Sequence, residues 1–205
     1  MSYGRAPRRR FTLLAAPAAV VALALALTLT ACGGDDNKVG GGGNTNFVTG
    51  SGGISTVAKG DRKAAPKLDG ETLDGKQLDV ADYKGKIVVL NMWGSWCGPC
   101  RLEAQYFARV AKETKDKGVQ FVGINTRDAQ KGPAVSFEKD YGVPYPSLFD
   151  PTGKLMLRFP KGTLRPQAIP STVVLDRDGK IAARSLAALD ADKLHKMIDP
   201  LIAEK

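Results

Sequence analysis

Two cysteines, Cys97 and Cys100, stand two residues apart in the run Trp96-Cys97-Gly98-Pro99-Cys100. This spacing lets two thiols close a small disulfide ring. A helix beginning at the pair would add free backbone N–H groups and the positive end of its dipole, and both stabilise a thiolate. Cys97 is therefore predicted to be the attacking nucleophile, and Cys100, one turn further in and more shielded, the resolving thiol. Pro99 suits the first helical turn, where its missing N–H is not needed.

The same spacing also occurs in metal sites, where it supplies two of four ligands. Further ligands are scarce in this chain, because its one histidine, His195, lies far along the sequence and its third cysteine, Cys32, has another expected role. We therefore predict thiol–disulfide chemistry, with no metal and no cofactor. His195 is expected to be a surface or boundary residue of the last helix.

The N-terminal sequence resembles the export signal of a bacterial lipoprotein. Arginines precede an apolar run over residues 11–29, and residues 29–33 (LTACG) are similar to a lipobox. The resemblance implies a lipoprotein-type signal peptide at residues 1–31 and a membrane anchor of lipid on Cys32. An uncleaved transmembrane helix is the alternative. Residues 8–11 (RRRF) also resemble a twin-arginine motif, so the export route stays open.

Residues 32–64 are predicted to be the lipidated cysteine and a flexible tether, because they are rich in Gly, Ser and Asn and poor in large apolar side chains. Residues 65–205 are predicted to be one folded domain. The formal net charge is +9, but no basic block with interleaved aromatics is present. Nucleic acid is therefore not an expected partner.

The apolar patterns of residues 65–205 predict alternating strands and helices. Two dipeptides, Asp69-Gly70 and Asp74-Gly75, indicate a short hairpin. The other predicted strands are residues 86–93, 119–125, 171–175 and 180–184, and the predicted helices are residues 97–115, 133–141, 154–159 and 190–204. This order implies an α/β fold, a mixed sheet with helices on both faces.

The segment from Val88 to Arg101 (VVLNMWGSWCGPCR) resembles the active site of thioredoxin-like proteins, in particular the TlpA/ResA-like thiol–disulfide oxidoreductases. Residues 65–86 are similar to that family's N-terminal extension, residues 141–154 to its central insert and residues 169–180 to its proline loop and hairpin. The resemblance implies a thioredoxin-like fold, in which a central mixed β-sheet flanked by helices carries an N-terminal β-hairpin extension and a central insert.

The resemblance also implies which residues meet the substrate. Pro170 corresponds to a proline whose preceding peptide bond is cis and which lies against the two cysteines. Ile169, just before it, would offer backbone groups to an extended substrate, much as a strand edge does. Trp96, at the mouth of the site, is assigned to substrate binding together with Gly98 and Pro99.

Glu103 corresponds to a family carboxylate that would relay the proton of Cys100. The alternative for Glu103 is an ordinary solvent-facing helix acid. Asn91 stands where cytosolic thioredoxins carry a buried Asp, and because Asn cannot take a proton, Glu103 gains importance. The loop 161–168 looks longer than usual, and Ile169 replaces a common Thr, so the substrate's identity stays open.

The family resemblance implies a protein disulfide reductase at the extracytoplasmic face of the bacterial membrane. It would take electrons from a membrane thiol donor and pass them to oxidised protein substrates such as apocytochrome c. The same site run in other directions would make an oxidase or isomerase. A copper-binding chaperone of this fold is the alternative from another class, although its wider cysteine spacing and its histidine are not evident. A peroxidase of the peroxiredoxin type lacks support, because Leu90 stands where its motif requires proline.

Overall fold

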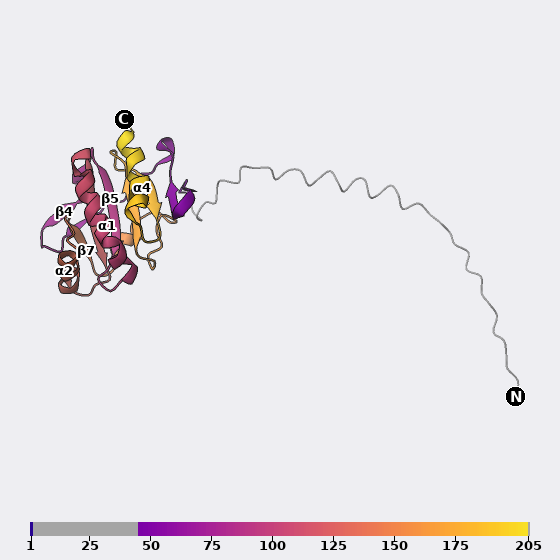
Figure 1. Ribbon diagram of the computed structural model, residues 1–205, viewed down its shortest axis with the longest axis horizontal. Coiled ribbons are helices and arrows are strands. Elements are labelled where there is room, and N and C mark those ends of the chain that lie inside the picture. The colour runs from indigo at the N-terminus through magenta and orange to yellow at the C-terminus, as the bar shows by residue number, and fades with distance from the viewer. Residues whose placement is uncertain (2–44, 205) are drawn as a thin grey trace. The chain divides into compact units, whose positions relative to one another are not determined.

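A seven-stranded mixed sheet forms the centre of the described part of the chain, which is residue 1 and residues 45–204 of a computed structural model (Figure 1). In sheet order its strands are β1 (Val48–Thr49), β2 (Ile54–Thr56), β9 (Ile181–Ser185), β8 (Ser171–Leu175), β5 (Ile87–Trp93), β6 (Val119–Thr126) and β7 (Ser147–Asp150). Strands β5, β6 and β7 run parallel, and the other neighbours pair antiparallel. The predicted mixed sheet is confirmed.

Strand β5 lies between β6 and β8, and all seven of its residues are buried. Its alternate residues enter two different cores: Val88, Leu90 and Met92 join one, and Ile87 and Val89 the other. A strand covered on both faces is apolar along nearly its whole length, which explains why its sequence shows no alternation; Asn91 is its one polar residue. The chain leaves β5 after Trp93, at the carboxyl end of the parallel strands, and the cysteine pair follows at once.

The helices are α1 (Gly98–Thr114), α2 (Lys131–Asp140), α3 (Lys154–Leu157) and α4 (Ala191–Ala203). Single 3-10 turns lie at Ser51–Gly53, Lys59–Asp61, Val80–Tyr83 and Lys115–Lys117. Helices α1 and α4 lie side by side over one face of the sheet (Figure 1). Their buried faces meet through Phe107 and Val110 of α1 and Leu194 and Ile198 of α4. The short α3 packs into the core on the other face through Leu155.

A separate hairpin of β3 (Asp69–Glu71) and β4 (Gln77–Asp79) is the predicted N-terminal extension. It docks on the edge strand β7, because Thr72 forms a bridge with Leu148 and the N–H of Leu73 donates to the carbonyl of Ser147 at 2.9 Å. Strand β7 itself was not among the predicted elements. It is only four residues long and follows two prolines, which weaken a strand pattern.

The folded domain begins earlier than predicted, which corrects the assignment of residues 45–64 to a tether. Strand β2 pairs with β9, and the buried Ile54 packs in the core beneath α4. Arg62 donates to both carboxylate oxygens of Glu204 at 2.7 and 2.6 Å and to Asp176 at 3.1 Å. The Gly-rich composition of this segment did not predict its folding. A few apolar and charged residues, such as Ile54 and Arg62, are enough to add two short strands at this end of the sheet.

The predicted signal peptide, Cys32 and the first part of the predicted tether fall in residues 2–44, outside the described residues. Across residues 45–204 no helix combines the length and the apolar character that crossing a bilayer requires.

The early start of the domain predicts a stability difference between two neighbouring strands. Ile54→Ala should lower the free energy of unfolding by about 2–4 kcal/mol, because it opens a cavity between β2 and α4. Val48→Ala, at an exposed position of β1, is the matched control and should cost less than about 0.5 kcal/mol. Urea unfolding followed by circular dichroism measures both. Equal costs would mean that this segment is not part of the folded domain.

Candidate active site

The two cysteines are joined as a disulfide, with a sulfur–sulfur distance of 2.02 Å, at the first turn of α1. Cys97 is the N-cap of the helix, and its sulfur accepts a hydrogen bond from the backbone N–H of Cys100 at 3.2 Å. Pro99 lies in the first turn, where a missing N–H leaves no hydrogen bond unmade. When the disulfide opens, this N–H and the helix dipole favour negative charge on Cys97. Both cysteines are buried, with 3 % and 1 % of their surface exposed, so they differ less in shielding than predicted.

The loop before the cysteines is held by Asp128, a residue that the sequence analysis missed. One carboxylate oxygen accepts from the backbone N–H of Ser95 at 2.8 Å and from the Asn125 side chain at 2.7 Å, and the other accepts from the Ser95 hydroxyl at 2.5 Å. Asp128 thus ties the β5–α1 loop to the segment after β6. Polar residues directly after a buried strand were the available signal, because loops at the carboxyl ends of parallel strands meet there.

Trp96 forms the exposed rim beside Cys97, with 49 % of its surface accessible. Its ring packs over Gly94, where an added Cβ would come within 2.7 Å of the indole nitrogen. On the same ring lies the guanidinium of Arg127, 4.8 Å from the centroid. Trp93, by contrast, is buried and stacks on Phe137, as a core aromatic does.

Glu103 is buried in α1, so the alternative of a solvent-facing acid is wrong. Only 2 % of its surface is exposed. One oxygen accepts from the Asn91 side chain at 2.9 Å, and the other accepts from the backbone N–H of Leu189 at 3.0 Å. Burial raises the pKa of Glu103 to about 7, and the two hydrogen bonds oppose this shift without cancelling it. The group is therefore poised to exchange a proton near neutral pH.

A small void links Cys100 to the surroundings of Glu103. Its volume is about 10 Å³, near the lower limit for one water molecule. Cys100 and Asn91 both line it, as does Tyr145, and Asn91 in turn donates to Glu103. Burial raises the pKa of Tyr145 strongly, with the Glu103 charge adding to the effect, so the phenol stays neutral there. Tyr145 is a second residue that sequence reasoning missed.

The peptide bond between Ile169 and Pro170 is cis. Ile169 packs against the apolar cluster that contains both cysteines, and the next residue, Pro170, is buried. The preceding loop is held by Arg184, whose guanidinium donates to the carbonyl of Gly162 and, at 2.9 Å, to that of Thr163. The structure thus brings Ile169 to the cysteines, as the site requires.

His195 lies apart from this cluster, on α4. It hydrogen-bonds Asp199 at 3.1 Å and Glu113 at 3.3 Å and is partly exposed, as a boundary residue is. Nowhere in residues 45–204 do three potential metal ligands of the His, Cys, Asp and Glu types converge.

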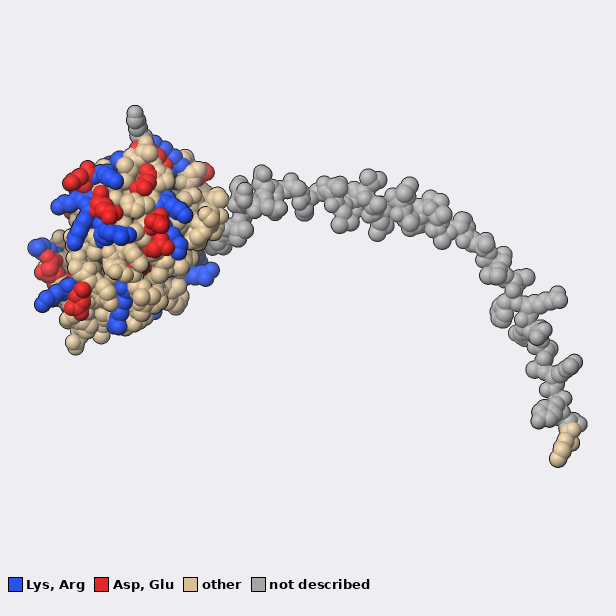
Figure 2. Space-filling model, viewed as in Figure 1, with Lys and Arg blue, Asp and Glu red and all other residues tan. Residues whose placement is uncertain are grey.

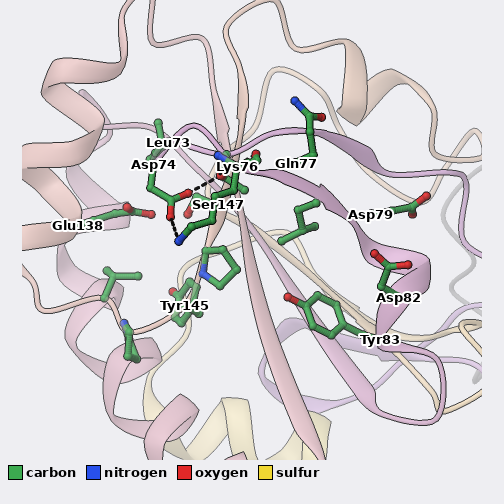
Figure 3. A pocket seen from close by; sticks show the side chains of 15 residues that line it. Leu73, Asp74, Lys76, Gln77, Asp79, Asp82, Tyr83, Glu138, Tyr145 and Ser147 are labelled. Carbon is green, nitrogen blue, oxygen red and sulfur yellow. Dashed lines mark hydrogen bonds and ion pairs between the residues drawn. The ribbon is translucent and has the colours of Figure 1, made fainter.

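A cleft of about 590 Å³ lies beside the hairpin and not at the cysteines (Figure 3). Leu73 lines the cleft and also packs in the cluster around Cys97 and Cys100, so it is a wall shared by both. Lys76 in the cleft is paired with Asp74 at 2.7 Å. The carboxylates that line the cleft are Asp74, Asp79, Asp82 and Glu138.

The family model called Redoxin matches residues 58–198. The chain belongs to the Redoxin family. The matched region starts before residue 65, in agreement with the early start of the folded domain. It contains both cysteines, Glu103 and the cis-proline loop.

Named relatives of this Redoxin protein are thiol–disulfide enzymes. It is 30 % identical to the thiol–disulfide oxidoreductase ResA of Bacillus cereus over 132 residues, 64 % of this chain and 73 % of that one. It is 33 % identical to the thiol:disulfide interchange protein DsbE of Vibrio cholerae over 142 residues, 68 % and 72 % of the two chains.

Solved structures agree. A DsbF homologue from Corynebacterium diphtheriae is 38 % identical, with a TM-score of 0.69 over 78 % of this chain and 100 % of that one. A secreted thiol–disulfide isomerase from Corynebacterium glutamicum is 31 % identical, with a TM-score of 0.71 over 80 % and 100 % of the two chains. The predicted thioredoxin-like fold is confirmed, and this Redoxin protein is a thiol–disulfide oxidoreductase.

The raised pKa of Glu103 predicts how the stability of the oxidised protein changes with pH. Between about pH 4.5 and 7 the folded protein holds a proton that the unfolded chain has released, so the free energy of unfolding should fall by about 3 kcal/mol as the pH rises through that window. Glu103→Gln should lack this fall. Urea unfolding at a series of pH values, with the disulfide kept intact, measures both.

His195 needs a control, because its partner Asp199 raises its pKa and stability is lost in the same direction as the pH rises. His195→Gln should keep the fall that Glu103 causes. Both oxygens of Glu103 accept hydrogen bonds, whereas Gln has one oxygen and would turn its NH₂ group toward one of the two donors. Glu103→Gln should therefore lower the absolute stability as well, so the pH dependence is the quantity to compare. An unchanged fall in Glu103→Gln would contradict the assignment.

Proposed function

We propose that this protein is an extracytoplasmic protein disulfide reductase held at the bacterial membrane by lipid on Cys32. The observation that carries the catalytic part is the hydrogen bond from the Cys100 N–H to the Cys97 sulfur at the start of α1. It places a backbone N–H at the positive end of a 17-residue helix against the Cys97 sulfur. The lipobox-like sequence at residues 29–33 supports the anchor.

In the proposed reaction the reduced Cys97 thiolate attacks one sulfur of a substrate disulfide. The substrate S–S bond breaks, a new bond joins Cys97 to the substrate, and the released substrate sulfur takes a proton. Cys100 then loses its proton and attacks the Cys97 sulfur. The second substrate thiol leaves, so the substrate gains two electrons and two protons while the protein gains the Cys97–Cys100 disulfide.

Glu103 is proposed to accept the proton of Cys100 in that second step. Its burial and its pKa of about 7 support this role, because a base with a pKa near the working pH holds and releases protons readily. Asn91 supports it as well. It donates to Glu103, lines the void with Cys100 and cannot itself take the proton.

The substrate is proposed to lie as an extended segment along Ile169, whose backbone precedes the cis-proline Pro170. The partial exposure of Ile169 and its packing against the cysteine cluster support this placement. Trp96 would flank the reacting sulfur from its exposed rim, and Gly98 and Pro99 would form the floor next to Cys97.

The reducing direction is supported by the Gly98-Pro99 pair, which resembles that of reducing thioredoxins. The proposed partners are a membrane thiol donor and oxidised proteins outside the cytoplasm, with apocytochrome c as one such substrate. Isomerase activity is the second candidate, because a relative with 31 % identity is named a secreted thiol–disulfide isomerase.

The reduction potential of the Cys97–Cys100 couple tests the reducing direction. Equilibration with glutathione or dithiothreitol buffers should give a value between about −200 and −270 mV, the range of glutaredoxins and thioredoxin. A value close to about −120 mV, as in strong oxidants, would overturn the reductase proposal. Cys97→Ser, which cannot form the couple, is the control for any other redox-active group.

A further inference from the structure

Two arginines flank the segment that leads into the nucleophile. Arg127 lies over the exposed ring of Trp96, at 4.8 Å from its centroid. Arg101, on the first turn of α1, donates through Nε and Nη2 to the carbonyl of Ser95 at 3.2 and 2.8 Å. Both side chains are exposed. Arg101 is four residues after Cys97, and Arg127 lies against Trp96, the residue before Cys97. Positive charge therefore borders the mouth of the site.

Neither guanidinium has a carboxylate partner among the described residues, and both contact the segment that precedes Cys97. Over the face of α1 and α4, basic and acidic side chains are interspersed (Figure 2). There Arg109 pairs with Glu113, and Lys193 pairs with Asp190. Arg101 and Arg127 form no such ion pair within the described part of the chain, so their charge at the active-site mouth is available to a partner.

The backbone holds Arg127 in place at a conformational cost. Its φ of 60° lies in the left-handed region that a residue with a side chain rarely adopts. The N–H of Arg127 donates to the carbonyl of Asp150 at 3.2 Å, and its guanidinium reaches the carbonyl of Gln167 at 3.5 Å. Gln167 is two residues before Ile169. Arg127 thus lies between the rim at Trp96 and the loop that leads to the cis-proline, and strain of this kind persists where the surrounding contacts fix it.

The carboxylate next in sequence does not cancel this charge. Asp128 is 6 % exposed, and both of its oxygens are engaged by Ser95 and Asn125. Two guanidinium groups against one buried carboxylate leave the mouth net positive. Both arginine side chains are exposed, so a bound substrate segment can reach their guanidinium groups.

We propose that Arg127 and Arg101 select substrates in which an Asp or Glu lies beside the disulfide cysteine. A segment extended along Ile169 with its sulfur at Cys97 would pass close to Arg127, whose guanidinium contacts both Trp96 and the carbonyl of Gln167. Guanidinium groups bind carboxylates through paired hydrogen bonds, and Arg127 can do so while it stays stacked on Trp96. Charges at the rim of an interface act mainly on the rate of association and on its salt dependence. The inference rests on the proposed attack by Cys97 and adds the substrate class.

The test uses the full-length protein with Cys100→Ser, reduced, so that the Cys97–peptide disulfide is the end product. Three activated-disulfide peptides differ only in the residue next to cysteine, which is Asp, Gln or Lys. The quantity compared is the ratio of the second-order rate constants for the Asp and Lys peptides, since the intrinsic reactivity of the peptides cancels between protein variants. The ratio should fall about threefold in Arg127→Gln, the typical effect of one exposed ion pair, and further in Arg127→Glu.

Arg109→Gln, an exposed arginine of α1 that is paired with Glu113, is the matched control and should leave the ratio unchanged. Arg127→Lys keeps the positive charge and should therefore retain most of the Asp-to-Lys ratio. In the protein that keeps all of its arginines, the Asp-to-Lys ratio of rate constants should also fall as salt is added, because salt screens exposed charges. Ratios in Arg127→Gln and Arg127→Glu equal to that of Arg109→Gln would overturn the proposed selectivity. Failure of the neutral Gln peptide to react with any of the proteins would instead overturn the attack by Cys97, and the inference with it.

Discussion

The backbone N–H of Cys100 points at the sulfur of Cys97 from 3.2 Å, and the site depends on this contact. It exists only because Cys97 is the last extended residue and Gly98 the first helical one. Strand β5 must therefore end at Trp93, and the loop between must be fixed. Two hydrogen bonds from Ser95 to Asp128 hold it, and Asn125 of β6 holds Asp128 in turn, so a carboxylate outside the cysteine pair helps to position the start of the helix.

A second constraint is the burial of an acid beneath the cysteines. Glu103 gains two hydrogen bonds in the core, yet the loss of water outweighs them and leaves its pKa near 7. A surface carboxylate would be ionised at that pH and could not return a proton. The N–H of Leu189, two residues before α4, is one of the two donors, so the segment that leads into the C-terminal helix takes part in setting this pKa.

The chemistry could be predicted from the sequence because it is local: the cysteine spacing, Pro99 and the apolar run of β5 lie within a few residues. The cis bond before Pro170 came from family resemblance, since local sequence seldom distinguishes the isomers. Three other features of the site depend on which loops the sheet order brings together. They are the burial of Glu103, the hydrogen bonds that Asp128 accepts and the contact of the Arg127 guanidinium with the Trp96 ring. The short strands β1 and β2 were not predicted, because two or three residues carry too little pattern.

The most direct test is a titration of the Cys97 thiol in the reduced protein, followed by thiolate absorbance and by the rate of alkylation against pH. We expect a pKa well below the value of about 8.5 for a free thiol, because a helix begins at that sulfur. A pKa at or above about 8.5 would show that the helix start does not activate Cys97, and Cys97 would then not be the attacking thiolate.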